Sequence, residues 1–243
     1  MNRRAFENRI HRKLLSLGWR VQRNTPVPEV WLPGQAYWKA AYLRRLGFRP
    51  ATVIDVGVAY GTPELYEAFP KAELLLVEPS AEFAAAIQAI LSARQGVYVP
   101  VALGVETGER ELHVEPRRPL LTSLFVRRDL ERTGDATVPR RVTVETLDRV
   151  LAAHPCPRPY GLKIDAEGAE LEVIRGARET LRDSEFVIAE VSVPQRFEGG
   201  YRFAELIIEL DRHGFEVCDI LDIGRAPTSI VVFLDVVFQR RTG

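Results

Sequence analysis

The feature that most constrains this chain is the alternation, after residue 50, of short apolar runs with amphipathic helical patterns. The runs are apolar on both faces, as buried strands of a parallel sheet are. Strands that alternate with such helices are typical of a doubly wound α/β fold. The last two runs have no helix between them, so we expect an antiparallel pair at one end of the sheet. The seven runs are 51–56, 74–77, 97–103, 161–164, 186–191, 215–223 and 230–239.

Residues 1–50 differ from the rest in charge. They hold 11 Lys and Arg residues against 2 acids, a net of +9, whereas the other 193 residues hold 22 basic and 31 acidic side chains, a net of −9. Helical apolar spacing recurs over 6–17 and 38–46, with prolines between. We predict a basic helical appendage over 1–50 and an α/β domain over 51–243. The appendage could attract nucleic acid, a membrane surface or the acidic domain, within one molecule or in a homodimer.

Several classes of protein are excluded by what the sequence lacks. No apolar run approaches the roughly 18 residues that a membrane-spanning helix needs. The first 20 residues are interrupted by Arg and His, unlike a signal peptide. Two cysteines, Cys156 and Cys218, make neither a disulfide framework nor a metal cluster. We therefore expect a cytoplasmic protein with reduced thiols.

The first strand leads into a glycine loop. Residues 53–61 read Val-Ile-Asp-Val-Gly-Val-Ala-Tyr-Gly, so a buried strand ends in a loop that holds Gly57 and Gly61. Thr62 can cap a following helix, and Pro63 suits its first position. A strand, a glycine loop and a helix in this order form the place where open α/β sheets bind nucleotides.

The glycine spacing discriminates between nucleotide ligands. Residue 59 is Ala, where a dinucleotide fingerprint needs the glycine that admits a pyrophosphate, and no P-loop Lys follows. Glu78 lies 21 residues after Gly57, where an acid can accept hydrogen bonds from ribose hydroxyls. Asp55 adds negative charge that favours a cationic ligand. The pattern favours S-adenosylmethionine (SAM), although Asp55 could instead cap the loop and Glu78 could be a solvated strand end.

A second group of charges ends the strand at 161–164. Strand alternation puts Lys163, Asp165 and, if the strand continues, Glu167 on one face. Charges on a buried strand are costly unless they are paired or functional, so we expect them beside the cofactor. Asp165 or Glu167 could alternatively cap the helix that starts near Gly168.

The sequence resembles the FkbM-type SAM-dependent methyltransferases over about residues 51–240. The block LKIDAEGAELEVIRGA at 162–177, with VTVETLD upstream, is the specific part of the match. The resemblance implies a Rossmann-like class I methyltransferase with a seven-stranded, mostly parallel sheet, an antiparallel last strand, and SAM as methyl donor. It also implies O-methylation of a hydroxyl on a sugar, glycan or small metabolite. The other matching motifs are VIDVGVAYG at 53–61, LLLVEPS at 74–80, VALG at 101–104 and FVIAEVS at 186–192.

The resemblance also implies the site residues. Tyr60 departs from the family pattern, which has a small residue or Asn there, and could narrow the methionine end of the pocket or cover it. The implied donor-binding residues are Asp55, Gly57 and Gly61 in the first motif, Glu78 followed by Pro79 at the ribose, and Ala102 and Leu103 beside the adenine, with Asp165 and Glu167 near the transferred methyl group.

Methylation of a hydroxyl requires a base within hydrogen-bond reach of the departing proton. Asp165 is the first candidate and Glu167 the second, since neighbouring carboxylates raise one another's pKa. No His, Cys or Asp spacing predicts zinc, and we predict no metal, although Asp165 with another carboxylate could hold Mg²⁺.

The arginine-rich segment 110–141 allows two interpretations. It could be a lid that recognises an anionic acceptor through Arg contacts. It could instead be a solvated loop whose arginines pair with nearby acids. Those acids would be Glu111, Glu115, Asp129, Glu131 and Asp135.

Two rival functions make different predictions. A nucleic-acid methyltransferase that uses the basic arm should carry an Asn/Asp-Pro-Pro-aromatic motif, where this chain reads Asp-Ala-Glu-Gly. A non-catalytic SAM-binding module should have lost the motif acids, which are all present. Both rivals are therefore disfavoured, and nucleic acid is not an expected partner.

Overall fold

The computed structural model describes residues 39–128, 137–226 and 229–241. By its internal contacts the chain divides into Met1–Pro33 and Gly34–Gly243, and the second unit is described here. The helix predicted over 6–17 lies outside the described residues. The helix predicted over 38–46 is present as α2 (Ala40–Arg45) and packs on α3 (Pro63–Ala68) in the second unit.

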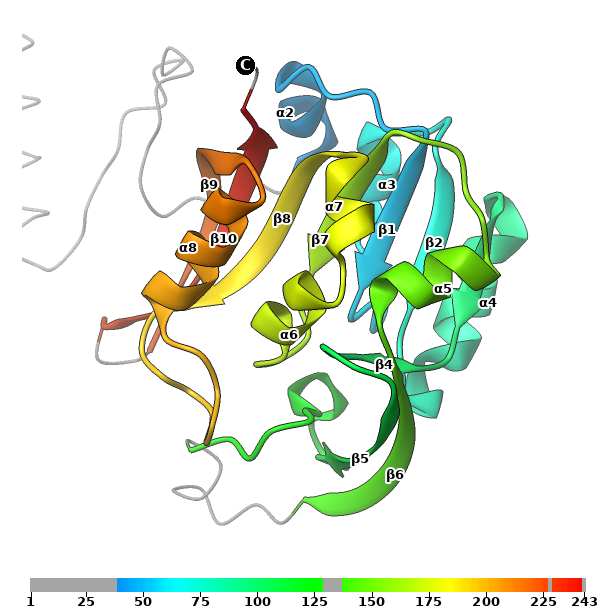
Figure 1. Cartoon of the computed structure of the whole chain (residues 1–243). Coiled ribbons are helices and arrows are strands. Elements are labelled where there is room, and N and C mark those ends of the chain that lie inside the picture. The colour runs from blue at the N-terminus through cyan, green and yellow to red at the C-terminus, as the bar shows by residue number, and fades with distance from the viewer. Residues whose placement is uncertain (1–38, 129–136, 227–228, 242–243) are drawn as a thin grey trace, which may run out of the picture. The chain divides into compact units, whose positions relative to one another are not determined.

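A seven-stranded sheet forms the centre of this unit, in the order β3-β2-β1-β7-β8-β10-β9 (Figure 1). Strands β3, β2, β1, β7 and β8 are parallel, and β10 is antiparallel to both of its neighbours. This confirms the mostly parallel sheet with an antiparallel last strand. The strands are β1 (Thr52–Val56), β2 (Glu73–Val77), β3 (Gly96–Val99), β7 (Tyr160–Ile164), β8 (Ser184–Ser192), β9 (Phe215–Arg225) and β10 (Val231–Arg240).

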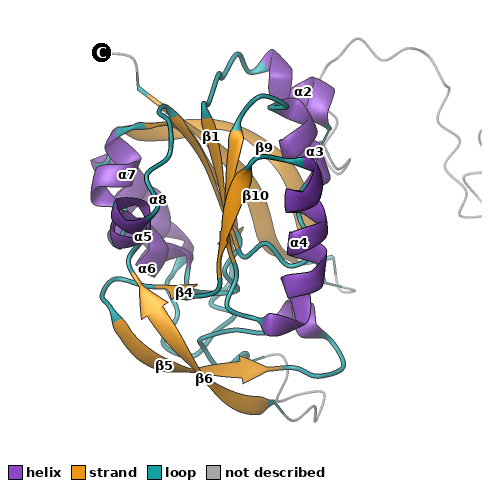
Figure 2. Cartoon of the chain, turned by 90° about the vertical axis from the view of Figure 1, so that its right-hand side faces the viewer, coloured by secondary structure: helices purple, strands orange, loops and turns teal. Residues whose placement is uncertain are grey.

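Helices cover both faces of the sheet (Figure 2). Helices α2, α3 and α4 (Ala84–Ala93) lie on one face, with the short η1 (Ala81–Phe83) before α4. The opposite face carries α5 (Leu147–Ala153), α6 (Glu170–Arg175), α7 (Arg178–Arg182) and α8 (Phe203–Arg212). Gly176 and Ala177 separate α6 from α7.

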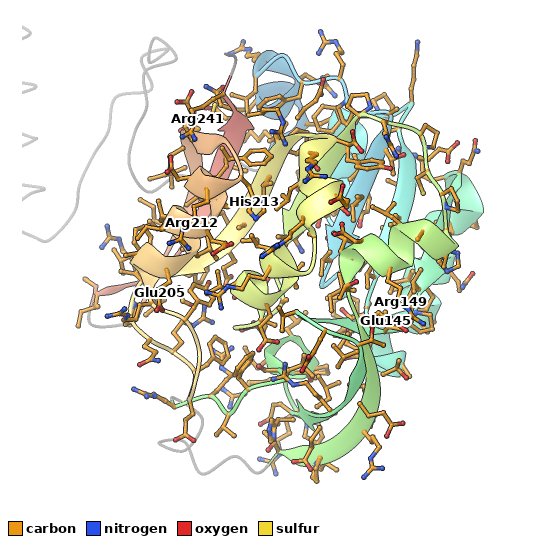
Figure 3. All side chains as sticks on the ribbon, in the orientation of Figure 1. Glu145, Arg149, Glu205, Arg212, His213 and Arg241 are labelled. Atoms are coloured by element: carbon orange, nitrogen blue, oxygen red, sulfur yellow. The ribbon has the colours of Figure 1, made fainter. Side chains whose placement is uncertain are left out.

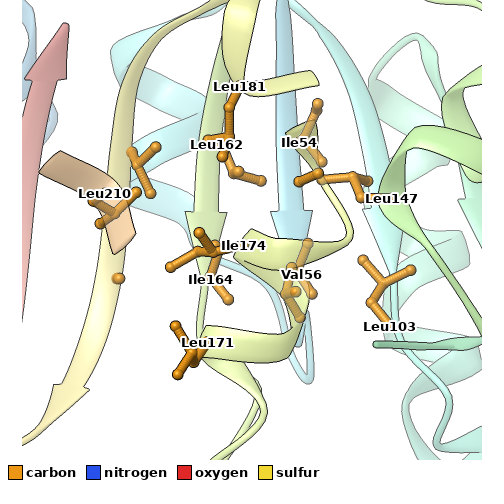
Figure 4. Packing of buried hydrophobic residues seen from close by; sticks show 14 of the residues in the cluster. Ile54, Val56, Leu103, Leu147, Leu162, Ile164, Leu171, Ile174, Leu181 and Leu210 are labelled. Carbon is orange, nitrogen blue, oxygen red and sulfur yellow. The ribbon is translucent and has the colours of Figure 1, made fainter. Parts of the chain in front are cut away.

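The core follows from the alternation of side chains along each strand. Ile54 and Val56 on β1 pack with Leu162 and Ile164 on β7 toward α5 to α8 (Figure 4). Val53, which directly precedes Ile54, belongs to the cluster that faces α2 to α4. Both faces of the central strands are therefore buried, which is why these strands read as continuous apolar runs.

A second sheet of three strands, in the order β4-β6-β5, lies beyond the carboxyl ends of β1 and β7 (Figure 1). It comprises β4 (Ala102–Leu103), β5 (Gly108–Val114) and β6 (Val138–Glu145), and a short η2 (Pro119–Leu121) follows β5. The single strand predicted over 97–103 is thus two strands, one in each sheet. Pro100 lies between them and has no N–H to continue a ladder. The strand β6, which begins at the end of the arginine-rich segment and continues beyond it, was not predicted.

Several charged side chains lie close to a side chain of opposite sign, as Arg149 and Glu145 do in Figure 3. Arg149 Nε lies 3.1 Å from a Glu145 carboxylate oxygen, and His213 at the end of α8 lies 3.6 Å from Glu209. Exposed pairs such as Arg149 with Glu145 contribute about 0–1 kcal/mol each, so the buried core determines the fold. Among the described residues, no helix combines the length and the apolar character needed to cross a bilayer.

Candidate active site

The glycine loop after β1 approaches the end of β7 closely. Gly57 has a φ of +73°, and a Cβ there would lie 1.7 Å from the backbone oxygen of Asp165. The Asp165 N–H in turn donates to the carbonyl of Val56. The two strand ends are therefore in direct contact, and only glycine fits at residue 57.

Glu78 fixes the geometry of this loop from the neighbouring strand. One carboxylate oxygen accepts the Ala59 N–H at 3.1 Å and the other accepts the Ser80 N–H at 2.8 Å. Burial raises the pKa of Glu78, while these two N–H groups lower it. Each oxygen keeps a second lone pair, so the carboxylate can hold the loop and accept further hydrogen bonds from a ligand.

A cavity of about 260 Å³ lies between the carboxyl edge of the main sheet and the three-stranded sheet. Apolar side chains from β5 and from the chain after it, including Leu112 and Leu124, form the outer wall of this cavity. Phe83 and Ser80 also line it, and neither was singled out from the sequence. Of the predicted site residues, the cavity brings together Gly57, Glu78, Pro79, Ala102, Leu103, Asp165 and Glu167.

Three predicted donor-binding residues do not line this cavity. Asp55 is fully buried and accepts hydrogen bonds from Thr62 Oγ1 at 2.9 Å and from the Tyr66 hydroxyl at 2.5 Å. It therefore ties the loop to α3, which is the loop-capping alternative. Tyr60 is 63% exposed, and its ring meets the ring of Phe83 edge-on with 5.0 Å between the ring centroids. Tyr60 and Gly61 both line a second, neighbouring cavity.

Lys163 connects the two strand ends electrostatically. Its ammonium donates to the Gly57 carbonyl at 2.9 Å and lies 3.2 Å from Asp55 and 3.6 Å from Asp165. Burial lowers the pKa of Lys163, but the carboxylates of Asp55 and Asp165 outweigh it and the net shift is upward. The lysine is therefore charged, and it lies between the two carboxylates.

Glu167 lies in a buried network with two arginines and a further acid. Its Oε2 is 2.5 Å from Arg127 and 3.3 Å from Arg196, and Arg196 is also 2.5 Å from Glu190. Burial and the charge of Asp165 raise the pKa of Glu167, whereas the two arginines lower it, and the net shift is upward. This network ties the loop after β7 to the segment around residue 127.

Arg127 belongs to the arginine-rich segment 110–141, whereas neither Arg196 nor Glu190 was singled out from the sequence. Glu190 is the one acid in the interior of the apolar run 186–191, and that isolated charge was the available signal. Other arginines of the 110–141 segment also pair with acids: Arg110 with Glu172, and Arg140 with Glu82, both at 2.5 Å. The pairing interpretation of this segment therefore fits these residues, with partners other than those expected.

Asp165, Glu167 and Glu190 offer carboxylate oxygens that all lie within 4.8 Å of one another. Such a group is of the kind that can hold a divalent cation. Arg196 contacts two of the three acids and Lys163 approaches the third, so protein cations already offset part of the charge.

This crowding predicts a stability that depends on pH. Burial and the charges of Asp165 and Glu167 raise the pKa of Glu190 above its ordinary value of 4.5, although Arg196 lowers it. The folded state then binds protons more tightly than the unfolded state, so the free energy of unfolding falls as pH rises from about 4.5 toward the raised value. In thermal unfolding across that range, we expect Glu190→Gln to show a smaller decline than the wild type. Glu179→Gln on the surface of α7 should keep the wild-type slope, and equal slopes for all three proteins would contradict the prediction.

Comparison with known proteins identifies the family. The profile of the methyltransferase FkbM domain matches residues 55–217, which include the glycine loop, Glu78 and the block after β7. The chain belongs to the FkbM methyltransferase family. The match confirms the resemblance seen in the sequence, and with it SAM as the methyl donor of the family.

Individual relatives are more distant. The hexuronic acid methyltransferase AglP of Haloferax volcanii is 25% identical over 139 residues, which are 56% of this chain and 54% of that protein. The chain thus spans about half the length of this curated relative. Among solved structures, an FkbM methyltransferase from Methylobacillus flagellatus KT is 13% identical with a TM-score of 0.45, covering 77% of this chain and 43% of the other. Magnesium protoporphyrin IX methyltransferase from Synechocystis PCC 6803, with bound SAM, is 11% identical with a TM-score of 0.47, covering 83% and 76%.

Proposed function

We propose that this FkbM-family chain transfers a methyl group from SAM to a hydroxyl of a saccharide or another small metabolite. The observation that carries the proposal is the 260 Å³ cavity, which meets Gly57, Glu78 and Asp165 at the carboxyl edge of the sheet. The similarity to a hexuronic acid methyltransferase supports a sugar acceptor. A cytoplasmic location and a homodimer stay predictions of the sequence.

The lining of the cavity fits an adenosyl donor. Ala102 and Leu103 offer an apolar surface for the adenine, and Glu78 offers lone pairs to the two ribose hydroxyls. Gly57 lets the backbone approach the ligand without a side chain between them. When bound, SAM supplies a methyl group activated by a sulfonium centre, so the protein mainly has to align the reactants and exclude water.

Asp165 is the residue best placed to accept the proton that the acceptor hydroxyl loses. Its side chain is 39% exposed, and it lines both the donor cavity and the neighbouring cavity. Glu167 lines the donor cavity, and two arginines contact its Oε2. We therefore assign Asp165 as the base and Glu167 as a positioning residue that holds Arg127 and Arg196.

Replacement of Glu78 tests the donor site. We expect Glu78→Ala to weaken SAM binding by at least about tenfold, because hydrogen bonds to a charged acceptor contribute roughly 1.5–3 kcal/mol each. Calorimetric titration of the full chain with SAM and with S-adenosylhomocysteine measures this directly. Glu73→Ala, at the other end of the same strand, is the matched control and should bind both compounds as the wild type does. Unchanged affinity in Glu78→Ala would refute the ribose assignment.

A further inference from the structure

The chain that follows β5 crosses the donor cavity. Residues 119–128 comprise η2 and the loop after it, and we call them the strap. Five residues of the strap line the donor cavity: Pro119, Leu120, Thr122, Ser123 and Leu124. Figure 1 shows this segment running beyond the carboxyl ends of β1 and β7 toward the loop that follows β8. The strap therefore faces, across the cavity, the strand ends that carry Gly57 and Asp165.

The cavity behind the strap leaves a donor little room. Ligand sites usually offer about 300–1,000 Å³, whereas this cavity offers about 260 Å³. The strap consequently lies close to the edge of the main sheet, and an adenosyl donor has to push it outward in order to enter or leave. How firmly the strap is held then determines how fast the donor exchanges.

Backbone and hydroxyl contacts attach the strap at two places. Near its middle, Ser123 exchanges backbone hydrogen bonds with His113 on β5, and the Ser123 hydroxyl donates to the Glu167 carbonyl at 2.6 Å. Near its end, the Val126 carbonyl accepts the Glu198 N–H at 2.9 Å. The strap is thus joined to β5, to the loop after β7 and to the loop after β8.

The side chain of Arg127 joins the end of the strap to both of these loops. Its guanidinium lies 2.5 Å from Glu167 Oε2 and over the Phe197 ring, 5.2 Å from the ring centroid. The Arg127 side chain is 5% exposed and the Glu167 side chain 16%, so salt and water screen this ion pair little. Charge-assisted hydrogen bonds of this kind are among the strong ones. Arg127 is therefore the contact that we expect to hold the strap most firmly.

Glu167 has a backbone conformation that needs support from its surroundings. Its φ is +46°, in the left-handed region that residues other than glycine rarely adopt. Ala59, which also lines the donor cavity, has a φ of +47°. Such conformations persist only where the surrounding structure determines them, and they cluster at functional sites. At Glu167, Arg127 and Arg196 supply that support, two residues from the proposed base Asp165.

We propose that Arg127 couples closure of the strap to assembly of the active site. With the strap closed, Arg127 encloses the donor and fixes the loop after β7, which places Asp165 beside the acceptor. When the strap opens, Glu167 loses one of its two arginines and that loop relaxes. Arg127 is a positioning residue, because it lines neither of the two cavities described above. The inference rests on the proposed function and adds the step that controls donor exchange; closure that completes a catalytic site is a common device in enzymes.

Release of S-adenosylhomocysteine tests the closure. Surface plasmon resonance with the full chain immobilised measures the dissociation rate. We expect Arg127→Gln to release the compound at least about tenfold faster than the wild type, since a hydrogen bond to a charged group accounts for about that factor. Arg128→Gln is the matched control, because its side chain is exposed and its backbone N–H keeps the bond to the Arg196 carbonyl. Equal rates for Arg127→Gln and the wild type would overturn the inference.

Phe197→Leu is a second variant, which serves if loss of the buried arginine unfolds the chain. Phe197 lines neither cavity, its ring supports the Arg127 guanidinium, and Leu still fills space beside Gly168. S-adenosylhomocysteine should dissociate about two- to fivefold faster from this variant, the usual contribution of a cation–π contact. A wild-type rate here would contradict the role given to Arg127.

Hydrogen exchange distinguishes coupling from a purely structural role. In the wild type, saturating S-adenosylhomocysteine should slow exchange in peptides that cover the strap and residues 165–168. In Arg127→Gln with the same compound bound, both segments should keep fast exchange, whereas the end of β2 near Glu78 should be protected as in the wild type. Equal protection of the strap in the two proteins, or a strap in the wild type that does not respond to the compound, would refute the coupling.

The outcomes separate this inference from the proposed function. Failure of both SAM and S-adenosylhomocysteine to bind the wild type would remove the proposed function and the inference together. Binding of both compounds, with wild-type dissociation and exchange in Arg127→Gln, would remove only the inference. The strap would then be a fixed wall of the donor cavity, and the donor would exchange through the neighbouring cavity.

Discussion

Replacement of Asp165 by Asn should lower the turnover number by about 10²–10⁴-fold, the usual contribution of a positioned general base. Asn has the shape of Asp but cannot accept the hydroxyl proton at neutral pH. The backbone contact of residue 165 with Val56 does not involve the side chain, so the strand end should keep its position. Lys163 would retain Asp55 as its ionic partner. We therefore expect the affinity for SAM to stay within about twofold, which is the pattern of a group needed in the transition state.

Two comparisons make this result specific. Asp211→Asn, the same change at an exposed position of α8, should keep full turnover. Glu167→Gln should weaken the contacts to Arg127 and Arg196 and affect the Michaelis constants as well as turnover, because it acts through those arginines. Steady-state kinetics with labelled SAM and an acceptor found by product screening measure all three variants. Full turnover of Asp165→Asn with SAM bound would show that another group takes the proton.

Replacement of Gly57 by Ala should destabilise the fold and remove the donor site together. The new Cβ would lie 1.7 Å from a backbone oxygen, so the strand ends would have to separate, and the φ of +73° would be strained for Ala. Strain of this kind costs about 1–3 kcal/mol before the clash is counted. For a chain of this size, about 3 kcal/mol corresponds to a fall of roughly 6–12 °C in melting temperature.

Other glycines of the chain provide the controls. Gly108→Ala places its Cβ where no atom lies within 4 Å and should leave the melting temperature unchanged. Gly61→Ala would meet the flexible end of Ile90 at 2.6 Å, at a φ of +94°, and should cost less than Gly57→Ala. Differential scanning calorimetry ranks the three variants, and SAM titration of the soluble fraction shows whether donor binding is lost with stability. A Gly57→Ala protein with wild-type melting temperature and SAM affinity would contradict the close approach of the two strands.

Local patterns predicted the parts of the site that lie next to each other in sequence. The loop at Gly57, the acid Glu78 and the acids after β7 each follow a strand that reads clearly as buried, and parallel strands bring such ends to one edge. The direction in which Asp55 points was harder to predict. It lies inside β1, and only the positions of Thr62 and Tyr66 on the other side of the loop decide that its carboxylate faces α3.

The grouping of acids in the neighbouring cavity depends on register, which the sequence does not display. Asp235 is the one acid of β10, Glu190 is the one acid of the run 186–191, and Asp222 is one of three acids in β9, so none of them stands out in the sequence as part of a group. They become a row only because β10 inserts between β8 and β9 with one particular alignment. The strand β6 was missed for a related reason. Its two arginines, Arg140 and Arg141, are adjacent and interrupt the series of valines, so the sequence shows no regular alternation there. Arg140 pairs with Glu82 from another segment.

The sheet β4-β6-β5 is built apart from the seven-stranded sheet, yet it supplies a wall of the donor cavity and, through the following η2, Leu120, which reaches both cavities. Insertions or exchanges in this segment leave the ladder of the main sheet intact, and surface segments of this kind vary most readily during evolution. Divergence of the family toward new acceptors can thus proceed in one separable piece of chain, while the strand ends that handle the donor are inherited unchanged.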